Sequence, residues 1–302
     1  MQRTFILSVA CFGLLAAAAA GCGSNQGCLE YAKTVCTRQI QCSSFSTLYY
    51  GPNFDICQTQ AARSCELSSK APDSNFSQAA ASACSQAISA ASCDDVLSGN
   101  YPAACRPAGN RPNGGSCADA FQCQSLFCNR ATSHDCGTCA PLPKLNEACT
   151  SNGLCDYGLQ CAAGTCAPYR ALGEACDADF YCQPSLACMN ATCQQPALNG
   201  ACSQAYECSD AQLQYCDANT LTCQPYPLTI AKVGESCGVA TDGVVGCPPA
   251  SFCKTMGSAA FGVCTMLPTE GQACAGSNSN LCASPTTCIS GTCQVFDRGS
   301  CG

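Results

Sequence analysis

The chain has 302 residues, of which 36 are cysteine and none is tryptophan. Its formal net charge is −7 at pH 7, and only 11% of its residues are charged. This negative balance argues against nucleic acid or an anionic membrane surface as an electrostatic partner. So high a cysteine content predicts a small disulfide-rich fold that forms outside the reducing cytosol.

The amino terminus has the pattern of an export signal. The basic residue Arg3 precedes an apolar run over residues 5–20, which is too short to span a membrane comfortably. The run ends in Ala-Ala-Gly-Cys at residues 19–22, which resembles the lipobox of bacterial lipoproteins, a motif that usually begins with Leu. The resemblance implies that residues 1–21 are a cleaved signal peptide and that Cys22 carries a lipid anchor.

The number of cysteines favours the same interpretation. If Cys11 leaves with the signal and Cys22 carries lipid, 36 − 2 = 34 cysteines remain, an even number that disulfides can consume completely. Under this interpretation residues 22–27 are a short tether. We then expect the first domain to sit close to the membrane and the rest of the chain to project outward. The alternative is that Cys22 is an ordinary disulfide partner in a secreted protein.

Residues 28–105 predict an α-helical domain laced by disulfides. Cysteine, alanine and larger apolar residues recur with helical spacing in three stretches, and Ser92 is suited to cap a short fourth helix. Segments 51–53 and 71–73 contain Gly or Pro and separate the helices. The eight cysteines of this domain can form four internal disulfides, with the pairing left open. The three stripes are Cys28, Ala32, Val35 and Cys36, then Cys57, Ala61 and Cys65, then Phe76, Ala80, Ala83, Cys84 and Ala87.

The richest apolar cluster of the chain lies in this domain, at Phe45, Leu48, Tyr49 and Tyr50. Two interpretations are open. The cluster can be the core of a small domain that has few other large side chains, or it can be a patch that binds a partner.

Residues 106–115 are rich in Gly, Pro and Asn and predict a linker. Residues 116–301 predict an array of six short β-hairpin repeats, which start near Cys117, Cys149, Cys176, Cys202, Cys237 and Cys274. Each repeat holds few large apolar side chains, so we expect structural disulfides to hold it folded. In the two most regular repeats the structural disulfide cysteines are Cys149, Cys155, Cys161 and Cys166, and Cys176, Cys182, Cys188 and Cys193.

Residues other than cysteine recur in the array as well. Residue pairs such as 163–164, 190–191 and 290–291 stand between the last two cysteines of a repeat and predict tight hairpin turns. A Gly or Asn stands three residues before each opening cysteine. Because these two residue types accept positive φ most readily, a left-handed turn is expected at the start of each repeat. These positions are Gly114, Asn146, Gly173, Asn199, Gly234 and Gly271.

The repeats resemble cysteine-rich modules of extracellular proteins, in particular the amino-terminal module of Dickkopf proteins and, more distantly, EGF-like modules. With the lipobox and the helical domain, the array resembles cysteine-rich lipoproteins of myxobacteria. The resemblance covers most of the mature chain and implies a surface protein without a defined activity. As a working hypothesis, the first cysteine of each repeat pairs with the third and the second with the fourth. The first repeat carries one extra cysteine, because it ends in Cys136-Gly-Thr-Cys139, and Cys301 is spare at the other end of the array. A disulfide from Cys301 to a cysteine of the first repeat would require the array to fold back; alternatively, both spare cysteines are available to other chains.

The sequence predicts no catalytic, cofactor-binding or metal site. Cys136-Gly-Thr-Cys139 has the spacing of a redox pair, but the Pro-containing segment after it cannot begin the helix that such a site needs. A single CxxC with one histidine, His134, offers too few ligands for zinc. A small-repeat array also has little interior in which His134 could act as a general base.

The sequence therefore favours a non-enzymatic lipoprotein of the outer membrane or cell surface. Its repeats would act as a spacer, or as a binding or adhesion surface for an extracellular protein or polysaccharide. One alternative is a secreted cysteine-rich ligand or inhibitor. A second alternative is an enzyme that uses residues 28–105, where the lack of histidine leaves acid–base work to carboxylates such as Glu30, Asp55 and Glu66.

Overall fold

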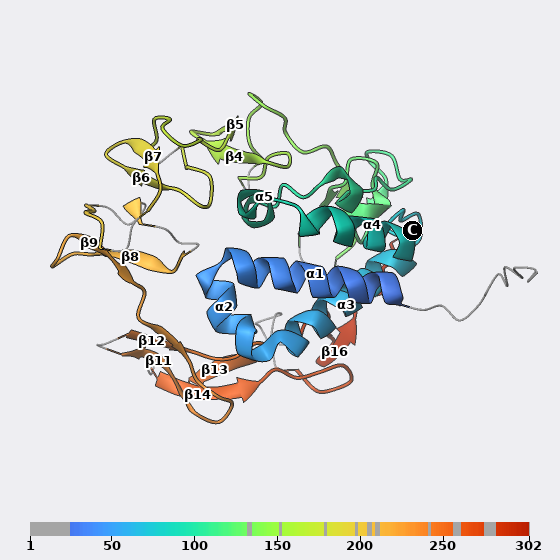
Figure 1. Ribbon diagram of the computed structural model, residues 1–302. Helices are drawn as coiled ribbons and strands as arrows, with labels where there is room; N and C mark the ends of the chain where they lie inside the picture. The colour runs from blue at the N-terminus through green and yellow to red at the C-terminus, as the bar shows by residue number, and fades with distance from the viewer. Residues whose placement is uncertain are drawn as a thin grey trace, which may run out of the picture.

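The computed structural model describes residues 25–131, 135–150, 153–177, 180–196, 199–203, 207–208, 212–240, 243–255, 261–274 and 282–301. The predicted signal peptide, the predicted lipid site Cys22 and His134 lie outside the described residues. Figure 1 shows a helical domain with a band of short hairpins curving around it. The fold is thus disulfide-rich, with helices first and antiparallel hairpins after them, as the sequence predicts.

The helical domain contains the four predicted helices, α1 (Gln26–Cys42), α3 (Phe54–Lys70), α4 (Gln78–Ser89) and α5 (Cys93–Ser98). Because α1 begins at Gln26, the last two residues of the predicted tether belong to a helix. Ser92 caps α5 as predicted, since its Oγ accepts a hydrogen bond of 3.1 Å from the Asp95 amide. A further helix, α2 (Ser44–Tyr50), was not predicted.

Disulfides and small side chains form much of the helical core. Phe76 and Ile88 are the largest fully buried apolar residues, and Tyr31 packs edge-on against Phe76. In α4 the buried residues include Ala81 and Ile88, while the predicted core residue Ala83 is exposed. The stripe was misplaced because alanine occupies several faces of this helix. Four internal disulfides join Cys28 to Cys65, Cys36 to Cys57, Cys42 to Cys93 and Cys84 to Cys105.

The hairpins that follow form small separate sheets. Four are two-stranded: β4 (Leu159–Ala162) with β5 (Thr165–Pro168), β6 (Ala187–Met189) with β7 (Thr192–Gln194), β8 (Gln214–Asp217) with β9 (Thr222–Pro225), and β15 (Thr286–Ile289) with β16 (Thr292–Val295). A three-stranded sheet has the order β1 (Ser116–Cys117), β3 (Gly137–Cys139), β2 (Cys128–Asn129).

The widest sheet has five strands in the order β10-β12-β11-β14-β13, and only the pair β10 and β12 is parallel. Its strands are β10 (Leu228–Ile230), β11 (Ser236–Ala240), β12 (Gly243–Gly246), β13 (Ser251–Thr255) and β14 (Phe261–Met266).

The predicted tight turns are confirmed. In the pairs 163–164, 190–191 and 290–291 both residues have positive φ, between 49° and 82°. This conformation is required by a two-residue type I′ hairpin loop, whose twist matches that of the flanking strands. Local turn chemistry therefore fixes the register of these hairpins.

The left-handed residues expected before each opening cysteine are confirmed at all six positions, with φ between 62° and 89°. In each case the left-handed residue donates its amide hydrogen to the carbonyl of a later cysteine at 2.8–2.9 Å. This bond folds the start of the unit onto its last strand. The donor and acceptor pairs are Gly114 and Cys139, Asn146 and Cys166, Gly173 and Cys193, Asn199 and Cys223, Gly234 and Cys264, and Gly271 and Cys293.

The working hypothesis for disulfide pairing is confirmed in the groups of four that open at Cys149, Cys176, Cys202, Cys237 and Cys274, where alternate cysteines are joined and two disulfides cross. The group that opens at Cys117 has five cysteines, and there Cys123 pairs with the last of them, Cys139, while Cys136 pairs outside the group. The bonds are 117–128 and 123–139, 149–161 and 155–166, 176–188 and 182–193, 202–216 and 208–223, 237–253 and 247–264, and 274–288 and 282–293. The eight predicted structural cysteines of the two regular repeats are all among them.

The array does not project outward from the helical domain, so that expectation is wrong. A disulfide joins Cys136 to Cys301 and brings the end of the array back to its beginning. The ring of Phe76, from the helical domain, stacks on Phe121 of the first hairpin unit at 4.3 Å. The predicted linker is also packed, because Arg111 is 8% exposed and its Nε donates to Asp73 at 2.9 Å. These contacts hold the array against the helices.

Candidate functional site

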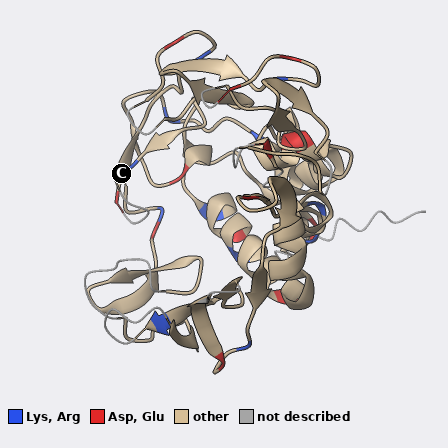
Figure 2. Ribbon diagram, turned by 90° about the vertical axis from the view of Figure 1, so that its left-hand side faces the viewer, with Lys and Arg blue, Asp and Glu red and all other residues tan. Residues whose placement is uncertain are grey.

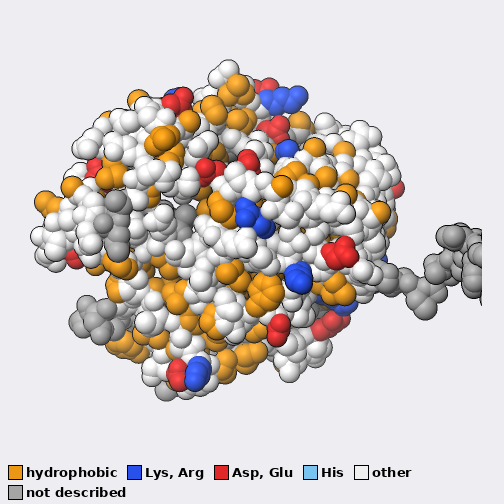
Figure 3. All heavy atoms as spheres, viewed as in Figure 1, with side chains coloured by type: hydrophobic (Ala, Val, Ile, Leu, Met, Phe, Trp, Pro, Cys, Tyr) orange, Lys and Arg blue, Asp and Glu red, His pale blue; other side chains and the backbone are white. Residues whose placement is uncertain are grey.

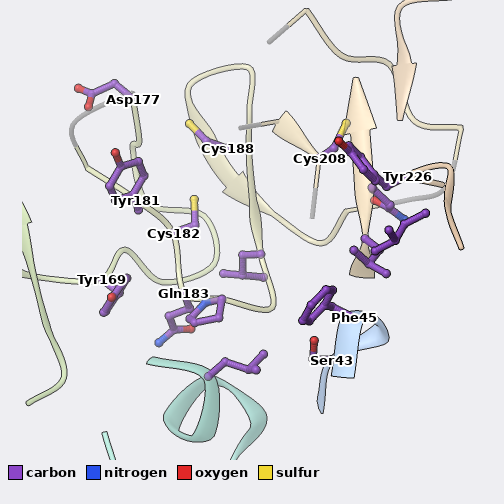
Figure 4. Close-up of a pocket in the computed structure, with 16 residues that line it drawn as sticks. Ser43, Phe45, Tyr169, Asp177, Tyr181, Cys182, Gln183, Cys188, Cys208 and Tyr226 are labelled. Atoms are coloured by element: carbon purple, nitrogen blue, oxygen red, sulfur yellow. The ribbon is translucent and has the colours of Figure 1, made fainter. Parts of the chain in front are cut away.

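A cleft of about 750 Å³ lies where the helical domain faces two consecutive hairpin units. Figure 4 shows Tyr169, Tyr181 and Gln183 on one side of the cleft, with Phe45 and Tyr226 on the other. Figure 3 shows hydrophobic side chains at the surface around α2 and the hairpins that face it. Leucines complete the apolar lining, and they are Leu97, Leu186, Leu213 and Leu228.

The helical wall of the cleft begins where α1 ends. Ser43 is buried, and its Oγ accepts a hydrogen bond of 3.3 Å from the Ser46 amide, which caps α2. Phe45 follows in the first turn of α2 and stacks on Tyr49, with the ring centroids 5.4 Å apart. Phe45 is 42% exposed and lines the cleft.

These positions overturn the core interpretation of the aromatic cluster at residues 45–50, because no residue of α2 is buried. The physical reason is that disulfides, alanines, Phe76 and Ile88 already fill the helical core. Phe45 is therefore left exposed, while Tyr49 and Tyr50 are only partly buried.

The array wall is held by a buried glutamine that the sequence analysis missed. Gln160, only 5% exposed, accepts a hydrogen bond from the Tyr181 amide and donates one to the Tyr181 carbonyl, both at 2.9 Å. The two bonds join consecutive hairpin units and fix the backbone from which the Tyr181 ring projects. Such a bridge has no local signal, because Gln160 and Tyr181 lie 21 residues apart.

A carboxylate joins the two walls. Asp94, in the first turn of α5, accepts hydrogen bonds from the amide of Ser185 at 2.7 Å and from its Oγ at 3.0 Å. Ser185 stands between Pro184 and Leu186, which both line the cleft. The Asp94 carboxylate thus fixes the helical domain to the array beside the cleft.

The electrostatics of the cleft are simple. Asp177 is the one charged side chain among the described residues that line it, and its carboxylate accepts a hydrogen bond of 2.9 Å from the Phe180 amide. Burial raises the pKa of the Tyr169 hydroxyl above its ordinary value of 10.0. Tyr169 is therefore a neutral hydroxyl at physiological pH, able to donate a hydrogen bond.

The described lining of the cleft holds no free thiol. Its three cysteines, Cys182, Cys188 and Cys208, are all in disulfides and supply no thiolate. The same holds for the groups of cysteine sulfurs that lie within 4.8 Å of one another elsewhere in the array. A disulfide sulfur lacks the charge of a thiolate ligand, so these groups are explained by crossing disulfides.

The remaining sequence candidates are dispersed. Cys136 and Cys139 are not bonded to each other, because Cys139 pairs with Cys123. Glu30 accepts a hydrogen bond from the Ser82 hydroxyl at 3.0 Å, and Glu66 accepts one from the side-chain amide of Asn25 at 2.6 Å. These contacts join α1 to α4 and the start of α1 to α3, and neither carboxylate lines the cleft.

No helix in the described part of the chain has both the length and the apolar character needed to cross a bilayer. Figure 2 shows positions of charged residues scattered along the ribbon. Comparison of the chain with protein-family models, with curated proteins and with solved structures finds no match.

Proposed function

We propose that this chain is a non-enzymatic, exported binding protein that is anchored at the cell surface through lipid on Cys22, with the cleft as its recognition site. The observation that carries the proposal is the place of the cleft along α1. This helix has 17 residues, and at about 1.5 Å per residue its length is about 25 Å. The anchor would precede the start of α1, whereas Ser43 and Phe45 follow its end. The cleft would then face away from the membrane.

We also propose that the array consists of six copies of one repeat, and that it acts as a clamp, by which we mean a band that holds one wall of the cleft against the helical domain. The shared left-handed residue, the shared amide-to-carbonyl bond and the crossed disulfides support this count. The clamp supplies one wall of the cleft and fixes it against Asp94. This role replaces the outward spacer, because the array curves around the helical domain.

Lipid attachment has support from the cysteine count. All cysteines from Cys28 to Cys301 are in disulfides, which accounts for the 34 that remain after Cys11 and Cys22 are set aside. Cys22 would therefore be available for modification. The alternative of a secreted ligand or inhibitor shares the cleft and lacks the anchor.

The anchor can be tested by growing a bacterial host that expresses the chain with an alkyne-bearing fatty acid. We expect the protein to take up the label and to sediment with membranes, and Cys22→Ser to remove the label and release the protein. Cys11→Ser is the matched control and should keep the label, because residue 11 lies within the predicted signal. A wild-type protein that is unlabelled and found in the medium would favour the secreted alternative.

A further inference from the structure

This inference rests on the proposed binding role of the cleft and names its ligand. We propose that the cleft takes an extended, proline-rich segment of an extracellular protein, with a basic residue placed beside Asp177. A segment of this kind forms a polyproline II helix, which has three residues per turn and leaves its backbone carbonyls without internal partners. Such helices dock in grooves lined by aromatic side chains.

The first support is the aromatic surface that the cleft presents. Phe45, Tyr181 and Tyr226 are 42%, 51% and 43% exposed, although all three belong to a residue class that is usually more deeply buried. They come from α2 and from two different hairpin units, and all three line the same open groove. Proline rings can fill the spaces between such aromatic side chains without losing conformational freedom, because the free ligand is already stiff.

The second support is the set of hydrogen-bonding groups at the cleft. Among the described residues, the hydroxyls of Tyr169, Tyr181 and Tyr226 and the side-chain amide of Gln183 make no hydrogen bond. These groups can donate hydrogen bonds, and the backbone of a proline-rich segment supplies free carbonyl acceptors while having few N–H donors. The donors of the cleft therefore match the acceptors of the ligand.

The third support is charge. Asp177 is the one charged side chain of the described lining, and the whole chain carries a net charge of −7. An acidic ligand would be repelled, while a Lys or Arg at one end of the segment would find a carboxylate at the edge of the cleft. This complementarity gives the ligand a preferred direction in the groove.

The fourth support is that the cleft is already formed. Two pairs of crossed disulfides, the contact of Ser185 with Asp94 and the bridge from Gln160 to Tyr181 hold its walls. A stiff site that binds a stiff ligand loses little conformational entropy on association.

Other occupants fit the lining less well. A fatty acyl chain is best served by an enclosed cavity, but three of the rings here are about half exposed to solvent. An oligosaccharide needs many polar partners for its hydroxyl groups, but four leucines occupy the lining beside a single carboxylate. These two ligand classes serve as competing outcomes in the experiment.

The experiment uses the full mature chain with Cys22→Ser, purified in oxidised form, and measures fluorescence polarisation. The probes are labelled decapeptide pools with prolines fixed three positions apart, an arginine at either end and the other positions varied. Control pools carry alanine for proline or glutamate for arginine. A labelled chitooligosaccharide and a fluorescent fatty acid are measured beside them.

We expect the pool with proline and arginine to bind at least 10-fold more tightly than either control pool. Tyr181→Ala and Tyr226→Ala should each weaken binding at least 10-fold, and Tyr181→Phe, which removes only the hydroxyl, about 3-fold. Phe261→Ala is the matched control, because Phe261 is 54% exposed on β14 and does not line the cleft. It should leave binding unchanged, and each variant should keep the wild-type circular dichroism.

Two results would overturn the inference in different ways. If the oligosaccharide or the fatty acid binds more tightly than the peptide and the two Tyr→Ala variants abolish that binding, the cleft is a binding site but its ligand class is wrong. If no probe shows binding that depends on Tyr181 or Tyr226, both the ligand class and the proposed role of the cleft fail.

Discussion

Cys136 and Cys301 are joined by a disulfide although 165 residues separate them in the sequence. Polar contacts reinforce this junction. Arg111 Nη1 donates to the Cys301 carbonyl at 3.0 Å, and Arg298 Nη1 lies 2.7 Å from an Asp119 carboxylate oxygen. The end of the array is therefore fixed to its first unit, and the array becomes a closed band. Closure lets units in the middle of the band hold one wall of the cleft.

Replacing Cys136 and Cys301 together with serine should open the band. A loop of this length corresponds to about 5 kcal/mol of loop-closure free energy, but other disulfides already restrict the unfolded chain. We therefore expect the free energy of unfolding to fall by about 2–4 kcal/mol. Limited proteolysis should also begin to cut near β15 and β16. As a control, replacing Cys149 and Cys161 with serine should leave the carboxyl-terminal hairpin resistant to the protease. If this hairpin is equally resistant after Cys136 and Cys301 are replaced, the result would contradict closure of the band.

The ion pair of Arg298 with Asp119 should stabilise the junction. Their side chains are 18% and 11% exposed, and Asp119 also accepts a hydrogen bond of 3.0 Å from Ser68. Arg298→Met leaves a largely buried carboxylate without its cation, which should cost about 2–4 kcal/mol in denaturant unfolding. Adding Asp119→Asn to Arg298→Met should recover part of the loss. Strictly additive costs in this double-mutant cycle would show that the two residues are not coupled.

The left-handed turns at the openings of the units should tolerate Asn and Gly but resist other residues. Gly173 has a φ of 83°, and a Cβ at this position would meet nothing within 4 Å, so any cost of Gly173→Ala comes from the backbone. We expect a loss of about 1–2 kcal/mol in thermal unfolding. Asn146→Gly should change stability by less than about 0.5 kcal/mol.

Gly51→Ala is the control for this turn experiment. Gly51 also has open space around its Cβ position, but its φ is −53°, which alanine adopts freely. Equal losses from Gly173→Ala and Gly51→Ala would argue against a left-handed requirement at the start of the unit.

Burial, with Tyr101 as a smaller cause, raises the pKa of Tyr31 from 10.0 to about 12. The folded state therefore keeps the Tyr31 proton at pH values where the unfolded state loses it. The contribution of this proton to the free energy of unfolding is fully present below about pH 10. Between about pH 10 and 12 the free energy of unfolding falls by about 3 kcal/mol as this contribution is lost. Denaturant unfolding at pH 8–11 should show a smaller decline in Tyr31→Phe than in the wild type. Parallel declines in the two proteins would contradict the raised pKa.

Local features of the fold could be predicted from the sequence because their causes are local. Ser92 begins a helix through its own hydroxyl, and Gly173 adopts positive φ because it lacks a Cβ. The pairing of alternate cysteines was also anticipated. The sequence does not decide between a closed band and pairing with other chains, because pairing of Cys136 with Cys301 depends on how the whole array curves.

The candidate site was harder to predict because distant residues build it. The sequence allows Phe45 to belong to a core or to a binding patch, because its place depends on how completely disulfides and small residues fill the helical interior. Asp94 and Ser185 lie 91 residues apart, and Gln160 acts on the backbone of another unit. The local sequence does not distinguish a buried glutamine that bridges two backbone groups from an exposed glutamine.

Non-reducing peptide mapping of the monomeric protein by mass spectrometry tests the closed band most directly. The structure predicts one peptide pair in which Cys136 is linked to Cys301, together with Cys123 linked to Cys139. Free thiols at positions 136 and 301, or a Cys136–Cys139 bond, would contradict the band and the cleft wall that depends on it.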